Sequence, residues 1–87
     1  MNRDQLYYRI AMARLHIVKK HQELARLRAL HAKSPTASRL RRIRALLLDL
    51  PKLADQLDAD EDVMDGKPPE ERAANRLRRR AANNTNH

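Results

Sequence analysis

Apolar residues recur at helical spacing along residues 4–32, the first long segment of the chain. This segment has no Pro or Gly and is rich in strong helix formers. Most of its large apolar residues are three, four or seven positions apart and so share one side of a helix, namely Leu6, Ile10, Ala13, Ile17, Leu24 and Leu27. Smaller residues form a second stripe nearly opposite, at Ala11, Leu15, Val18, Ala25 and Ala29. The pattern predicts one long helix that touches two neighbours.

The stretch 31–38 interrupts this pattern and predicts a short connection to a second helix. Ser34 is the expected N-cap of that helix, with Pro35 in its first turn. Thr36 and Ser38 are alternative caps one turn later. A connection this short typically joins two antiparallel helices into a hairpin.

A heptad pattern predicts a second helix over residues 36–64. Its apolar seam consists of Leu40, Ile43, Leu47, Leu50, Ala54 and Leu57, and Leu46 and Leu53 widen the seam on one flank. Pro51 has no amide hydrogen to donate to the carbonyl of Leu47, so we expect this helix to be kinked near Pro51. Gly66 and the two prolines that follow Lys67 end it.

The C-terminal part, residues 67–87, predicts a short basic helix that starts at Pro69, followed by a polar tail from Asn83 onward. The helix has only alanines and Leu77 as apolar surface, and it is too short to be stable alone. Residues 1–66 form the expected hairpin.

The predicted fold class is all-α. The chain has 87 residues, a single Gly and no Phe, Trp or Cys, which argues against a turn-rich β fold and excludes a disulfide framework. Two helices alone cannot enclose a core, so we expect two hairpins to dimerise into a four-helix bundle. A three-helix monomer is the alternative. The residues expected at the dimer or partner interface are Leu15, Val18, Leu40, Ile43, Leu47, Leu50 and Leu57.

Charge divides the chain into blocks. The net charge is +8, and the acids concentrate in residues 49–65 between two basic blocks. Arginine dominates the cations, and its guanidinium group suits phosphate oxygens. We therefore expect contact with the backbone of RNA or DNA through two clusters. The first comprises Arg72, Arg76, Arg78, Arg79 and Arg80, and the second comprises Arg39, Arg41, Arg42 and Arg44.

The acidic block resembles a calcium loop only in spacing. Asp58, Asp60 and Asp62 stand two residues apart, but Val63 replaces the required Gly and Pro69 stands where the bidentate acid belongs. A better interpretation is pairing of these acids with the basic tail, within one chain or across a dimer. Such pairing would mask the tail until a polyanion competes.

Catalysis, cofactors and metals have little support in the sequence. There is no Cys, one Gly excludes a Gly-rich phosphate loop, and His16 and His21 are five residues apart, which does not place two ligands on one helix face. No apolar run is long enough for a membrane span. We expect a non-enzymatic, cytoplasmic accessory or regulatory factor that binds nucleic acid. The alternative is a regulator or inhibitor, of the kind that phages and mobile elements use, that binds an acidic host protein through its helix faces.

Overall fold

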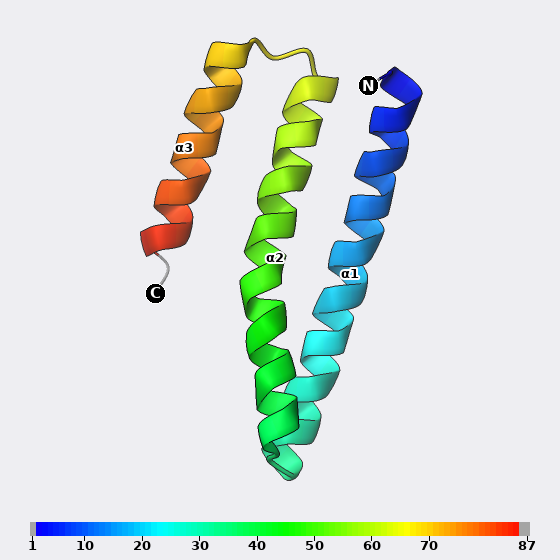
Figure 1. Ribbon diagram of the computed structural model, residues 1–87, viewed down its shortest axis with the longest axis vertical. Coiled ribbons are helices and arrows are strands. Elements are labelled where there is room, and N and C mark those ends of the chain that lie inside the picture. Colours follow the sequence, from blue (N-terminus) through cyan, green and yellow to red (C-terminus); the bar gives the residue numbers. More distant parts are fainter. Residues whose placement is uncertain (1, 86–87) are drawn as a thin grey trace.

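A computed structural model describes residues 2–85, which form three helices joined by short turns (Figure 1). Helix α1 spans Arg3–Lys33, α2 spans Ala37–Met64 and α3 spans Pro69–Thr85. The all-α prediction and the positions of the three helices are confirmed. Residues 83–85, expected in the polar tail, belong to α3, and the rest of that tail lies outside the described residues.

The helix ends follow from local capping chemistry. The Asn2 side chain accepts from the backbone N–H of Gln5 at 2.8 Å and starts α1 with a capping box. Thr36, rather than Ser34, caps α2 and accepts from the Arg39 N–H at 3.1 Å. Ser34 instead ends α1, where its N–H donates to the Leu30 carbonyl. The expected cap at Ser34 is therefore wrong, because the Thr36 side chain supplies the cap and Pro35 stays in the connection between the helices.

The three helices lie side by side in one layer, with α2 in the middle (Figure 1). The molecule measures 49 × 30 × 14 Å, and its shortest dimension is close to the diameter of one helix, about 10–12 Å. Among the described residues, α3 packs against α2 and makes no contact with α1. The third helix therefore does not close a bundle over the hairpin, and both broad faces of the layer stay uncovered.

The core lies between α1 and α2, and it is small. Its centre is formed by Leu24, Ile43, Leu46 and Leu50, with Ile17 and Leu27 packed against it. Leu46 is fully buried, at 0% exposure. The buried side of α2 therefore differs from the predicted seam, because Leu46, predicted on the flank of that seam, lies at the centre of the core.

Leu47 and Ala54, which the heptad pattern placed on the seam, are exposed instead; Leu47 is 44% exposed. Both stripes have heptad spacing and share positions 43, 50 and 57; packing against α1 selects 46 and 53, rather than 47 and 54, to complete the buried side. Leu47 consequently faces one open side of the layer. The helix itself continues through Pro51 without a break.

Candidate nucleic-acid interface

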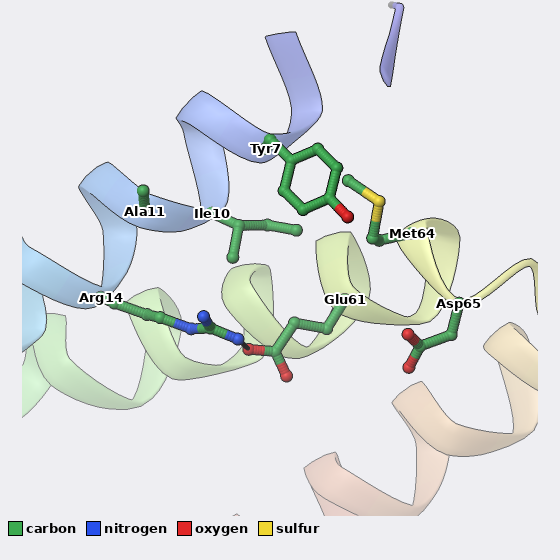
Figure 2. A pocket seen from close by; sticks show the side chains of 7 residues that line it. All are labelled: Tyr7, Ile10, Ala11, Arg14, Glu61, Met64 and Asp65. Carbon is green, nitrogen blue, oxygen red and sulfur yellow. Dashed lines mark hydrogen bonds and ion pairs between the residues drawn. The ribbon is translucent and has the colours of Figure 1, made fainter. Parts of the chain in front are cut away.

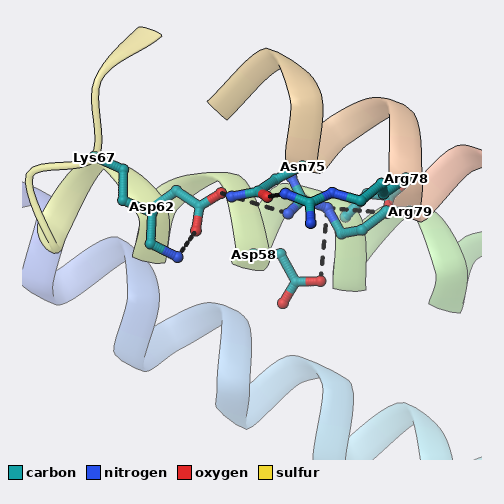
Figure 3. A network of polar contacts seen from close by, with 7 residues as sticks. Asp58, Asp62, Lys67, Asn75, Arg78 and Arg79 are labelled. Atoms are coloured by element: carbon teal, nitrogen blue, oxygen red, sulfur yellow. Dashed lines mark hydrogen bonds and ion pairs between the residues drawn. The ribbon is translucent and has the colours of Figure 1, made fainter. Parts of the chain in front are cut away.

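A seam of charged side chains joins α2 to α3. Asp55, Asp58 and Asp62 are three and four residues apart on α2, so they form one stripe along the helix. Arg79 of α3 lies against all three carboxylates. Its Nε atom is 3.7 Å from Asp55 Oδ1. The same atom is 3.8 Å from Asp58 Oδ2, and the Nη1 atom is 3.5 Å from Asp62 Oδ2 (Figure 3). The expected pairing of the acidic block with the basic tail is therefore present within one chain.

Asp62 is the most connected acid of this seam. It is 6% exposed, and its carboxylate accepts from Lys67 Nζ at 3.1 Å and from Asn75 Nδ2 at 3.2 Å (Figure 3). Burial opposes ionisation of Asp62, but the hydrogen bonds from Lys67, Asn75 and Arg79 outweigh burial and hold its pKa below the ordinary value. Asp62 thus holds the turn and α3 against α2 as an anion.

The turn between α2 and α3 sets the direction of α3. Gly66 adopts φ +73°, the left-handed conformation in which glycine commonly ends a helix. The Lys67 N–H donates to the Asp62 carbonyl at 3.1 Å and the Gly66 N–H donates to the Val63 carbonyl at 3.0 Å, as in a Schellman motif. The apolar contact that often accompanies this motif is replaced here by the ion pair between Lys67 and Asp62. The turn and the charged seam therefore share one aspartate.

The pKa of Asp58, in the same seam, is shifted in the direction opposite to that of Asp62. Burial raises the pKa of its carboxyl, the nearby Arg79 lowers it, and the neighbouring acids Glu61, Asp55 and Asp62 raise it further, so that the net direction is upward. The seam contains more carboxylates than Arg79 can satisfy. This local excess of acid keeps Arg79 in place.

The five tail arginines divide into two groups. Arg72 and Arg79 are partly buried and face the seam, and the side chain of Arg79 is only 20% exposed. Arg76, Arg78 and Arg80 are exposed. Leu77, the one large apolar residue of α3, is also exposed, so the seam is polar and not a hydrophobic contact.

The second predicted arginine cluster, within residues 39–44, also contains both bonded and exposed side chains. Arg42 donates from Nε and Nη2 to the Glu23 carboxylate at 3.2 and 2.7 Å, and its hydrogen bonds lower the pKa of Glu23. Arg39 donates to the backbone carbonyl of Ser34. Arg41 and Arg44 are exposed. Two of the four predicted residues therefore hold the hairpin together, and two are open to a partner.

Two further ion pairs join α2 to α1 near the open end of the hairpin. Arg9 Nε is 2.8 Å from Asp60 Oδ2, and Arg14 Nη2 is 2.9 Å from Glu61 Oε1. Most acids of residues 49–65 are consequently paired with cations of the same chain. Five of the seven acids are ion-paired, namely Asp55, Asp58, Asp60, Glu61 and Asp62. The positive excess of the protein is carried by the exposed cations.

The outer side of α2, which faces away from α1, changes sign along its length. The part of this side before the acid stripe carries Arg41, Arg44 and Lys52, which helical periodicity places on the same side as that stripe. Leu48 lies among these cations and is 67% exposed. α3 covers the acidic half only. We call the exposed cations of this side, Arg41, Arg44, Lys52, Arg76 and Arg80, the basic edge.

The sequence patterns missed three residues of this interface: Lys52, Gln56 and Asn75. A signal existed for each. Lys52 is the one cation within residues 49–65, Gln56 stands four residues after it, and Asn75 stands between Arg72 and Arg79 at helical spacing. What the sequence lacked was the side of α2 on which α3 docks.

The predicted apolar interface residues are also divided by the structure. Ile43 and Leu50 are buried in the core between α1 and α2, and Leu40 and Leu57 are partly buried. Leu15, Val18 and Leu47 are exposed. Helical periodicity places Val18 and Leu47 on the same broad face of the layer, whereas Leu15 lies beside that face on the outer side of α1, nearly opposite the core. We call these three exposed residues the open apolar face.

A shallow cavity lies near the open end of the hairpin, where Tyr7 of α1 reaches toward Met64 of α2 (Figure 2). Its volume is about 230 Å³, and the ion pair between Arg14 and Glu61 crosses one side of it (Figure 2). The cavity holds no cluster of acids or histidines, and the residues described from 2 to 85 contain no group suited to binding a metal ion.

No protein-family model matches this chain, and no curated protein or solved structure matches it. None of the three described helices has an apolar stretch long enough to cross a membrane. The function is therefore inferred from the charges and geometry of the chain itself.

Proposed function

We propose that this protein binds the sugar-phosphate backbone of RNA or DNA through its exposed arginines and acts as a non-enzymatic accessory or regulatory factor. One observation carries the proposal: five acids of α2 are ion-paired within the chain, whereas the cations of the basic edge remain exposed. A net charge of +8 is therefore presented mostly as unpaired surface cations.

The chemistry of these residues fits phosphate better than base edges. Guanidinium groups bind phosphate oxygens in a bidentate manner, and the release of counterions from the nucleic acid adds a salt-dependent gain in affinity. Contacts of this kind position a protein on the nucleic acid and carry little sequence information. We expect the binding to tolerate many sequences.

The basic edge is long enough to follow several phosphates of one strand. Along α2, the distance from Arg41 to Lys52 is eleven residues, or about 16 Å at about 1.5 Å per residue. Each strand of duplex DNA has one phosphate per about 3.4 Å of helix axis, so this length spans about five phosphates. Arg76 and Arg80 of α3 line the same cavity as Lys52 and extend the edge further.

The test is fluorescence anisotropy with labelled duplex DNA and labelled single-stranded RNA. A variant with Gln at four basic-edge positions, Arg41, Arg44, Arg76 and Arg80, is compared with a control of equal net charge. The control carries Gln at four exposed cations of α1, namely Arg3, Lys19, Arg26 and Arg28. We expect the first variant to lose affinity far more than the control; equal losses would indicate nonspecific attraction by net charge and overturn the proposed surface.

We also propose that two copies pair through the open apolar face to form a four-helix bundle of two hairpins. The single-layer shape and the exposure of Leu15, Val18 and Leu47 support this. An antiparallel pairing would place the acid-rich end of one copy beside the basic end of the other. A bend of α2 at Pro51 and a cytoplasmic location remain predictions.

The oligomeric state is tested by sedimentation of a Leu15→Asp, Val18→Asp variant, with His16→Asp as the control on another side of α1. Loss of the dimer with helix content retained in the first variant alone would support the pairing. A wild-type protein that sediments as a monomer would contradict it. If that monomer captures a different protein through the same face, the alternative function as a protein-binding regulator is favoured.

A further inference from the structure

The seam between α2 and α3 has a cavity on each side, and the two cavities differ in charge. One has a volume of about 380 Å³ and is lined by Lys52, Asp55, Gln56, Ala59, Arg76 and Arg80. The other has a volume of about 430 Å³ and is lined by Asn75, by four acids and by three cations, namely Asp58, Glu61, Asp62, Asp65, Lys67, Arg78 and Arg79, so that its acids outnumber its cations. We call the first the basic cavity and the second the acidic cavity.

The basic cavity is built from two helical pairs. Lys52 and Gln56 are four residues apart on α2, and Arg76 and Arg80 are four residues apart on α3. Residues at this spacing are neighbours on a helix surface. Two antiparallel helices therefore direct long side chains into one cavity from both sides.

Three cations and one acid line the basic cavity, and the acid is already engaged. Asp55 Oδ1 is 3.7 Å from Arg79 Nε, the central cation of the seam. Within residues 2–85, no ion pair involves Lys52, Arg76 or Arg80, and Gln56 donates to Asp60 on the side of α1. The cavity consequently has an unbalanced positive charge while α3 is docked.

The unbalanced positive charge of the basic cavity disfavours the docking of α3 and suggests an anionic ligand. Like charges held close together across the seam oppose the docking of α3. An anion between them removes the repulsion and adds charge-assisted hydrogen bonds to both helices. Guanidinium groups with a nearby ammonium group are the donors that phosphate oxygens prefer.

We propose that the basic cavity is a phosphate-binding site, in which Lys52, Arg76 and Arg80 hold one phosphodiester group of a nucleic acid and thereby fasten α3 to α2. This inference rests on the proposed function and specifies where a phosphate is bound across two helices. It also means that α3 binds nucleic acid in its docked position, with Arg79 still in the acidic seam.

The test follows backbone amide hydrogen exchange in residues 72–82 with and without a short single-stranded RNA. In the wild-type chain we expect the RNA to slow this exchange about tenfold, the effect of roughly one charge-assisted hydrogen bond. Lys52→Gln, Arg76→Gln and Arg80→Gln should each remove this protection. Arg78→Gln is the matched control, because it removes the same charge from the same helix but lines the acidic cavity.

Three results would overturn the site while leaving the proposed function in place. The first is RNA binding without slower exchange in α3, and the second is a loss of protection in Arg78→Gln as complete as in Arg80→Gln. The third is faster exchange on RNA binding, which would show instead that the polyanion competes with the acids of α2 and releases α3.

If the RNA does not bind at all, the proposed function fails. A second experiment with inorganic phosphate then tests whether the basic cavity binds an anion. Slower exchange of α3 in phosphate than in chloride at equal ionic strength, dependent on Lys52, would keep an anion site with a different ligand. The absence of any phosphate effect would overturn both proposals.

Discussion

Arg79 Nη1 lies 3.5 Å from Asp62 Oδ2, and this contact joins one of the two most buried acids of α2 to the one arginine of α3 that is ion-paired within residues 2–85. Because Leu77 is exposed and the seam is polar, the position of α3 depends on charge more than on apolar burial. The attachment of α3 is therefore the part of the fold that is most sensitive to pH, salt and single charge changes.

Asp62→Asn should release α3 from α2. The amide keeps the size of the carboxylate but leaves Lys67 without its anion and removes one of the three carboxylates around Arg79, and we expect docking to weaken by about 2 kcal/mol. Hydrogen exchange of residues 69–82 measures this effect. Asp65→Asn is the control, since Asp65 is exposed at the end of the same helix; equal exchange rates in the two variants would contradict the role of Asp62.

Acidification should release α3 in the same way. The pKa of Asp62 is held below its ordinary value, so the stability that its carboxylate contributes is present above about pH 4 and is lost as the pH falls through its lowered folded-state pKa. Asp58 acts in the opposite direction, because its raised pKa favours the folded state as it protonates. A circular dichroism titration should therefore show loss of helix at low pH.

The control for this titration is Asp62→Asn, which should lack the low-pH step because its α3 is already released. Helix content and α3 protection that stay constant in the wild-type chain down to about pH 2 would contradict the assignment. High salt at neutral pH should weaken the docking of α3 as well, because the ion pairs of Arg79 are partly exposed to solvent.

Leu46→Ala should destabilise the hairpin strongly, whereas Leu48→Ala should not. Leu46 is completely buried in the core, and removal of such a side chain costs about 2–5 kcal/mol. Leu48 is exposed on the outer side of α2, so we expect a change within about 0.5 kcal/mol. Urea unfolding of the two variants compares them directly, and similar midpoints would mean that the core is placed wrongly.

Gly66→Ala should cost about 1 kcal/mol through backbone conformation alone. The space beside Gly66 is open, with no atom within 4 Å of the position that an alanine methyl group would take, so the cost comes from φ +73° and not from a clash. Gly66→Asn should cost less, because asparagine tolerates this conformation better. Thermal unfolding distinguishes the two, and an alanine variant as stable as the wild type would contradict the role of the turn.

The sequence predicted the helices well because their signals are local. Pro35, Gly66 and Pro69 mark the ends, and the helix boundaries fall within one residue of those expected, except that α3 continues three residues into the expected tail. The side of α2 that meets α1 was harder to predict. Leu46 and Leu47 are adjacent leucines on overlapping stripes, and only packing against α1 decides that one is buried and the other exposed.

The pairing of opposite charges in the candidate interface could be predicted from the sequence, but the individual residues that pair could not. Opposite charges in the acidic block and the tail indicated their pairing. The choice of Arg79 over Arg78 or Arg80 depends on the rotation of α3, which the Gly66 turn and the contacts of Asn75 set. The basic edge likewise required the placement of α3 on the side of α2 that carries Lys52.

Binding of nucleic acid through the basic edge is tested most directly by the salt dependence of this binding in the full chain. If the five cations of the basic edge neutralise about four phosphates, a plot of log affinity against log salt should have a slope of about −4 for duplex DNA, at about −0.9 per phosphate. Substitution of Arg41, Arg44, Arg76 and Arg80 by Gln should flatten this slope toward zero. Binding that does not depend on salt, or an unchanged slope in the substituted chain, would contradict the account.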